Sequence, residues 1–285
     1  MNRNRIISGL VCFAAALAFA ISASAQGAVQ KKYDNRARAQ ALWEEALRAK
    51  GGRERLHSVR NFLISSNIDV EAPKGSGITE TERLYVLPGK AWIYQFTPHF
   101  DVSLEATVIN MERNLCMVTL APARGDVPPL SSCVPTTWAA RLIQDPVIYL
   151  METEWVRPVP VRARVEGTGS GQVDVIETKV GDLRVDFYLH RKTRLPTKLV
   201  TDDYNGVKQA TQRMGLTVHL DKYVNVDGIQ MPGRVIRQPD VGWSIVRRDT
   251  ETARYKFNVE YDKTIFDNPI SKKAKANDWK LRKDD

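Results

Sequence analysis

The segment LRVDFYLH, residues 183–190, alternates strictly between apolar and more polar side chains. Its apolar members are Leu183, Val185, Phe187 and Leu189, and the residues between them are Arg184, Asp186, Tyr188 and His190. In an extended strand successive side chains point to opposite faces, so a period of two predicts a β-strand with one apolar and one wet face.

The same alternation recurs on both sides of this segment, at residues 92–96, 216–221 and 255–262. Turn-forming pairs stand between the alternating segments, for example Asn205-Gly206 and Asp227-Gly228. Short strands separated by such turns are typical of an antiparallel meander, either a sandwich or a curled barrel. The sequence therefore predicts a mainly β, α+β protein.

Two segments have the period of a helix instead. From Arg36 to Lys50 the apolar residues recur every three or four positions, and Gly51-Gly52 follows as a stop signal. Residues 136–152 predict two short helices that meet at Asp145-Pro146. Because each helix has an apolar side to bury, we expect the central pair to cover one face of the sheet as a lid.

The N-terminal residues have the three-part order of a secretory signal peptide. Two basic residues, Arg3 and Arg5, precede an apolar run from Ile6 to Ile21, and small residues lead to Gln26. We expect residues 1–25 to be removed, leaving one domain over 26–270 and a basic, flexible tail over 271–285. Export predicts a periplasmic location.

The formal net charge of +9 falls to +7 when Arg3 and Arg5 are removed with the signal peptide. An exported protein has no contact with nucleic acid, so this excess indicates attraction to anionic lipid head groups or to an acidic partner. An ordinary solvated surface explains it equally well.

After cleavage two cysteines remain, Cys116 and Cys133, which lie 17 positions apart around a proline-rich loop. In an oxidising compartment an even pair predicts a disulfide, which would stabilise the fold by about 3 kcal/mol. Free or metal-binding thiols are the alternative, although no histidine or further cysteine stands at ligand spacing beside them.

Catalytic and cofactor signatures are missing from the sequence. The four histidines are scattered, and neither a zinc motif nor a nucleophile elbow nor a dinucleotide fingerprint occurs. We therefore expect no enzyme activity, no cofactor and no metal. A pair of carboxylates that converge only in space would escape this search, which leaves a hydrolase of sugar or peptidoglycan as an alternative.

In its order of elements the chain resembles the superfamily of the periplasmic lipoprotein carrier LolA and its receptor LolB. The resemblance spans roughly residues 39–269. It rests on five short segments: ALWEEALRAKGGRERLHSVRNF (41–62), VLPGKAWIY (86–94), FYLHRKTRLPTKLV (187–200), YVNVDGIQMPGRV (223–235) and FDNP (266–269). The resemblance implies an unclosed β-barrel around helices, with an apolar cavity that receives acyl chains. The length, the proline-rich loop at 121–135 and the basic tail depart from the true carrier, so a lipid-binding or stress-sensing relative fits as well.

We therefore predict a non-catalytic binding or carrier protein, or a sensor, for an apolar ligand such as a lipid or a lipoprotein acyl chain. Lipid, an acylated lipoprotein and a complex of the inner or outer membrane are the expected partners, and a structural role in an envelope complex is a further alternative. The predicted cavity walls are apolar residues of early strands and of the helical lid: Trp92, Tyr94, Phe96, Leu104, Val108, Trp138, Leu142 and Ile143. Aromatic residues on strands also form ordinary core, and that alternative applies to each of them.

Overall fold

The computed structural model describes residues 35–72, 75–96, 102–113, 115–122, 131–132, 148–180, 183–201, 215–240 and 248–266. The predicted signal peptide and the basic tail lie outside these residues. No helix in these ranges has both the length and the apolar character needed to cross a membrane.

One antiparallel sheet contains all the described strands, and three helices accompany it. The strands are β1 (Asn61–Ala72), β2 (Gly75–Val86), β3 (Lys90–Phe96), β4 (Val102–Asn110), β5 (Leu115–Pro122), β6 (Ser131–Ser132), β7 (Val159–Glu166), β8 (Val173–Val180), β9 (Leu183–His190), β10 (Pro196–Thr201), β11 (Gly215–Val226), β12 (Ile229–Asp240) and β13 (Arg248–Phe257). The helices are the leading helix (35–50), α2 (Arg53–Ser58) and α4 (Ile148–Leu150), and short 3-10 turns occur at η1 (Met111–Arg113), η3 (Gly169–Gly171) and η4 (Lys263–Phe266).

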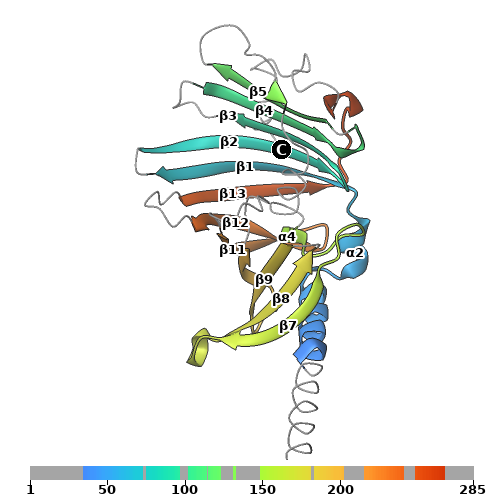
Figure 1. The fold of residues 1–285 in the computed structure, drawn as a ribbon, viewed down its shortest axis with the longest axis vertical. Coiled ribbons are helices and arrows are strands. Elements are labelled where there is room, and N and C mark those ends of the chain that lie inside the picture. The colour runs from blue at the N-terminus through green and yellow to red at the C-terminus, as the bar shows by residue number, and fades with distance from the viewer. Residues whose placement is uncertain are drawn as a thin grey trace, which may run out of the picture.

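The strand order is β6-β5-β4-β3-β2-β1-β13-β12-β11-β10-β9-β8-β7. Two meanders thus join where β1 pairs with β13, with Phe62 opposite Phe257 and Ile64 opposite Tyr255. Figure 1 shows the upper strands as a broad fan and the lower strands β7–β12 curling away from it. Within the described residues the sheet ends at β6 and β7 without closing, which confirms the predicted unclosed, mainly β architecture.

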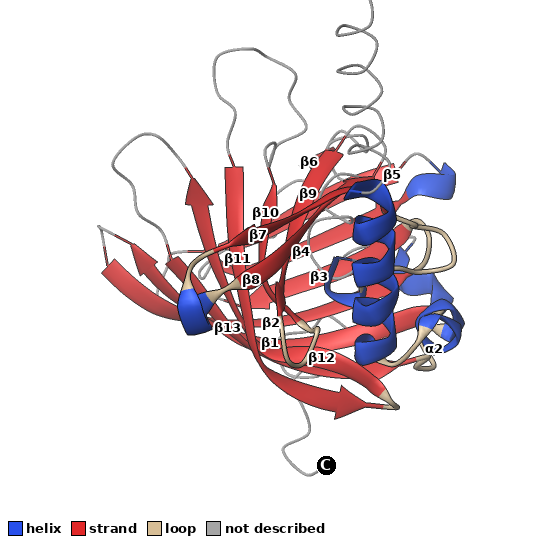
Figure 2. Cartoon of the chain, turned by 90° about the horizontal axis from the view of Figure 1, so that it is seen from below, coloured by secondary structure: helices blue, strands red, loops and turns tan. Residues whose placement is uncertain are grey.

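The leading helix confirms the prediction for Arg36 to Lys50 and packs against the concave face of the sheet. The apolar stripe is buried, and Trp43 meets Phe187 of β9 edge to face, with ring centroids 5.1 Å apart. Figure 2 shows the leading helix from below, in front of the curled sheet.

The Gly-Gly stop after this helix is required by the fold. The Gly52 N–H donates to the Leu47 carbonyl at 2.9 Å, and Gly51 has a φ of 130°. A Cβ at Gly51 would lie 2.4 Å from the Gly228 carbonyl oxygen, so the helix end and the β11–β12 turn approach too closely for any side chain.

The main core lies on the concave face. Val185, Phe187 and Leu189 of β9 are at most 1% exposed, as the alternation predicted. The opposite face of β9 is less exposed to solvent than predicted. Asp186 on this face is only 6% exposed, because it forms ion pairs with Arg164 and Arg184.

A second, smaller core lies on the convex face. It is centred on Leu84, Val108 and Phe266, with Trp92 packed against it. The turn η4 covers this cluster, because the chain leaves the sheet after Phe257 and crosses back over β3 and β4. The predicted strand at 255–262 therefore ends at Phe257, where Asn258 turns the backbone with a φ of 49°.

Candidate functional site

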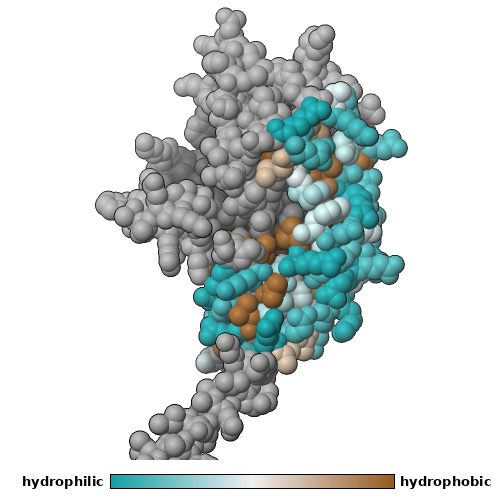
Figure 3. Space-filling model, turned by 45° about the vertical axis from the view of Figure 1, so that its right-hand side comes forward, coloured by the Kyte–Doolittle hydropathy of each residue, from teal (hydrophilic) through white to brown (hydrophobic). Residues whose placement is uncertain are grey.

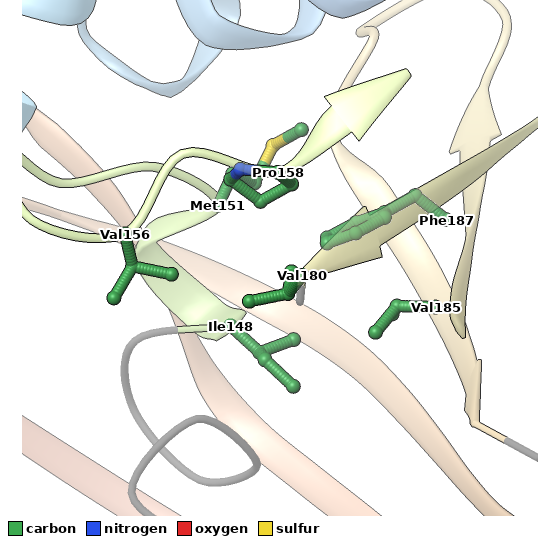
Figure 4. A pocket seen from close by; sticks show the side chains of 7 residues that line it. All are labelled: Ile148, Met151, Val156, Pro158, Val180, Val185 and Phe187. Atoms are coloured by element: carbon green, nitrogen blue, oxygen red, sulfur yellow. The ribbon is translucent and has the colours of Figure 1, made fainter. Parts of the chain in front are cut away.

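The concave face offers an apolar surface between the curled strands and the segment that follows α4. A small cavity of about 10 Å³ lies there (Figure 4). Its lining is apolar and comes from two sides, α4 with the residues after it and strands β8 and β9: Ile148, Met151, Val156, Pro158, Val180, Val185 and Phe187.

This cavity is too small for an acyl chain, since it has room for about one water-sized sphere. Its lining holds no charged group, so a water molecule would lack partners there. Space for a larger apolar ligand would open if the segment 148–158 moved away from β8 and β9. How that segment is anchored therefore decides what the site can do.

The first anchor is the carboxylate of Glu152, which is buried two residues after α4. Its Oε2 accepts a hydrogen bond from Trp43 Nε1 at 3.1 Å. Its Oε1 lies 2.8 Å from both Arg53 Nε and His57 Nε2. Burial raises the pKa of Glu152, but the hydrogen bonds from Arg53, Trp43 and His57 outweigh it, so this pKa lies below its usual value.

The second anchor is an ionic cluster on the concave face of β2, β12 and β13. The Glu251 carboxylate is fully buried and binds Arg83 of β2 and, at 2.6 Å, Arg237 of β12. Arg237 also donates to the Tyr149 hydroxyl of α4 at 2.9 Å. Burial raises the pKa of Glu251, but the two guanidinium groups outweigh it and lower this pKa to about 2.

The two anchors hold α4 and the residues after it from opposite sides. Glu152 ties them to the leading helix and α2, and Tyr149 ties them to the sheet. We call residues 148–152 the anchored segment. It is the described end of the central insert, so its polar contacts set how firmly the insert is attached.

A third buried charge lies at the end of the leading helix. Lys50 is fully buried, its Nζ donates to the Gln230 carbonyl, and it lies 5.3 Å from the centroid of the Tyr223 ring. Burial lowers the pKa of Lys50 to about 7. This group joins the leading helix to β11 and β12 and lines none of the described cavity.

The carboxylates of the two anchors are poorly suited to acid–base catalysis. Both Glu152 and Glu251 are held ionised by cationic partners, so neither can donate a proton near neutral pH. Among the described residues no group of three His, Cys, Asp or Glu side chains is placed to hold a metal ion.

The residues predicted as cavity walls fall into three groups. Trp92 and Val108 lie on the convex face in the second core, and Tyr94 points to that same face, with its ring stacked 5.9 Å from that of Trp92. Phe96 and Leu104 are register partners in β3 and β4. Trp138, Leu142 and Ile143 lie outside the described residues.

The disulfide stays a prediction. Cys116 is in β5 opposite Ile109, and Cys133 lies outside the described residues.

Sequence reasoning missed the two anchors. The signal for the second was present, because Thr79, Thr81 and Arg83 share one face of β2 with the buried Tyr85. An arginine at an inward position indicates a buried ionic partner, although nothing in the sequence identifies Glu251 as that partner. Glu152 is the last residue of the predicted helical pair and carries no comparable signal.

Known structures share this architecture, although no family model matches the chain and no curated protein is significantly similar in sequence. A LolA superfamily protein from Nitrosomonas europaea is 13% identical, with a TM-score of 0.50 over 82% of this chain and 99% of that one. A DUF1329 family protein from Desulfovibrio piger is 10% identical, with a TM-score of 0.49 over 80% of this chain and 96% of that one. The chain thus has a LolA-like fold.

Proposed function

We propose that this chain is a non-catalytic periplasmic carrier or sensor that binds an apolar ligand, such as a lipid or a lipoprotein acyl chain, on the concave face of its sheet. The observation that carries the proposal is the apolar cavity between the segment 148–158 and strands β8 and β9. The fold supports it, since an unclosed curled sheet has an apolar concave face that must be covered by something other than a second sheet.

Binding on this face is favourable for physical reasons. Each methylene group that leaves water contributes about 0.8 kcal/mol, so a long acyl chain offsets the cost of separating the segment from the sheet. Opening would separate Ile148 and Met151 from Val185 and Phe187, all of which line the cavity. The surfaces uncovered in this way are apolar, and the bound ligand would cover them again.

The hydrolase alternative receives less support from the described residues. A glycosidase needs one carboxyl group that can be protonated at working pH, and cationic partners lower the pKa values of Glu152 and Glu251. Burial raises the pKa of Glu82, but this residue lies on the convex face of β2, away from the cavity.

Titration with a fluorescent fatty acid tests the proposal. Saturable binding is expected for the unmodified protein. Val156→Phe should weaken binding at least fivefold, because Val156 lines the cavity and the larger side chain would occupy it. The variant should still fold, because Val156 is only half-buried. Val159→Phe is the matched control, because Val159 is 49% exposed and is not part of the lining. A folded Val156→Phe variant with unchanged affinity would remove the proposed site.

A further inference from the structure

Three arginine side chains converge on the carboxylate of Asp174 at the start of β8. Arg194 Nη1 lies 2.7 Å from Oδ2, Arg38 Nη2 lies 3.4 Å from Oδ1, and Arg191 Nε lies 3.6 Å from Oδ2. Arg38 belongs to the leading helix, and Arg191 and Arg194 belong to the β9–β10 turn. The aspartate side chain is only 7% exposed.

This cluster holds more positive charge than its carboxylates neutralise. Besides Asp174 it contains Glu45, whose Oε2 lies 2.8 Å from Arg194 Nε. Lys192 adds a further exposed cation between Arg191 and Arg194. The three arginines thus share two carboxylates, and Lys192 raises the excess of positive charge on the same turn. We call Arg38, Arg191, Lys192 and Arg194 the basic cluster.

The excess is exposed and available to a partner. The side chains of Arg38 and Arg191 are 52% and 44% exposed, while the carboxylate beneath them is buried. A carboxylate has about four acceptor positions, whereas three guanidinium groups offer roughly fifteen N–H donors. Asp174, Glu45 and the side-chain amide oxygen of Gln172 accept from these arginines, so the cluster holds fewer acceptors than N–H donors.

A second ionic group on the same sheet shows that such an excess is not needed to hold strands together. Across β7, β8 and β9, three arginines face three carboxylates in balanced pairs. The members of this balanced group are Arg162, Arg164, Arg184, Glu166, Glu177 and Asp186. The concentration of guanidinium groups around Asp174 is thus a local feature that pairing alone does not explain.

We propose that the basic cluster docks the protein on the surface of an anionic phospholipid membrane. Guanidinium groups match phosphate oxygens with paired, charge-assisted hydrogen bonds, and basic side chains near an anionic bilayer are attracted by its surface potential. Docking deepens the proposed function, on which it rests, because a protein that takes up lipid must approach a membrane. In the view of Figure 3, the described part of this face is mostly hydrophilic, with hydrophobic patches between, so attraction through charge fits better than insertion.

Co-sedimentation with vesicles tests this docking. The unmodified protein should bind vesicles of phosphatidylcholine with 30% phosphatidylglycerol far better than vesicles of phosphatidylcholine alone, and high salt should release it. The variant Arg191→Gln/Lys192→Gln should bind the anionic vesicles roughly 25-fold more weakly, since each basic residue at such a surface contributes about a factor of five. The substituted residues lie on an exposed turn, so folding should be preserved.

The control Arg254→Gln/Lys256→Gln removes the same charge from exposed positions of β13. Equal losses in the two variants, or equal binding of the unmodified protein to neutral and anionic vesicles, would overturn the proposal. Failure of the unmodified protein to bind anionic vesicles would also overturn it and would point to an acidic protein partner. Fatty acid titration of both variants keeps the two proposals apart, because the basic cluster lies outside the cavity and affinity for the free ligand should be unchanged.

Discussion

The indole N–H of Trp43 donates to the carboxylate of Glu152 at 3.1 Å, across 109 positions of the chain. This contact joins the leading helix to the anchored segment beside the cavity. Both side chains are buried, so if one partner is lost, the other has no water molecule to replace the hydrogen bond. Under the proposed function, stability and ligand uptake both depend on this carboxylate.

Replacement of Glu152 by Gln should reduce the free energy of unfolding by about 2–4 kcal/mol, because the charge that binds Arg53 and accepts from Trp43 is lost in a buried place. It should also speed association of a fluorescent fatty acid, since the anchored segment is held less firmly. Urea unfolding and stopped-flow mixing measure the two effects. Glu154→Gln is the control, because Glu154 is exposed and should change stability by no more than about 0.5 kcal/mol. Equal effects of the two substitutions would contradict the role of Glu152 as an anchor.

Replacement of Glu251 by Gln should cost about 3–5 kcal/mol of unfolding free energy, because Arg83 and Arg237 are then buried without their anionic partner. The loss should depend on pH. The pKa of Glu251 falls from 4.5 to about 2 in the folded protein, so its contribution is fully present above pH 4.5 and disappears as the pH falls toward 2. Urea unfolding of both proteins between pH 7 and pH 2 should show their curves converging at acid pH. A constant difference across this range would mean that ionisation of Glu251 does not stabilise the fold.

Burial of Lys50 should make the free energy of unfolding depend on pH above pH 7. Its pKa falls from 10.5 in the unfolded chain to about 7 in the folded one, so between these values the unfolded state binds more protons and stability rises with pH. From pH 7 to pH 9.5 the unmodified protein should gain up to about 3 kcal/mol relative to Lys50→Met, which has no charge to bury. Thermal or urea unfolding at the two pH values measures the gain. Parallel behaviour of the two proteins would show that Lys50 stays charged in the core.

Trp92 distinguishes the convex core from the ligand wall that the sequence predicted. Trp92→Ala should destabilise the protein by about 2 kcal/mol, because it removes packing beside Leu84 and Phe266. Its fatty acid affinity should equal that of the unmodified protein, since Trp92 faces away from the cavity. Reduced affinity in a folded Trp92→Ala variant would indicate that the ligand binds on the convex face.

The sequence was sufficient to predict the repeating elements of the fold. A period of two in residues 183–190 and a stripe on residues 36–50 arise from local geometry, so they could be read without knowledge of the tertiary structure. The inward or outward direction of a strand is not local. Trp92 and Tyr94 alternate correctly, but which face they occupy depends on how η4 crosses the sheet, and no pattern within β3 encodes that crossing.

The buried ionic contacts also could not be predicted from the sequence, for a physical reason. Glu251 meets Arg83 across 168 positions and Trp43 meets Glu152 across 109, so each pairing exists only once distant parts of the chain have come together. From sequence alone, charged residues of this kind are assigned to solvent, because burial of a charge is rare unless a partner compensates it.

Photolabelling with a diazirine fatty acid tests the central claim most directly. The acid is crosslinked to the folded protein with and without excess unlabelled ligand, and mass spectrometry locates the modified residues. The account predicts saturable labelling of the residues around the cavity, at 148–158 and on the concave positions of β8 and β9, and none at Trp92 or Phe266. Labelling that excess ligand does not reduce, or saturable labelling confined to the convex core, would contradict it.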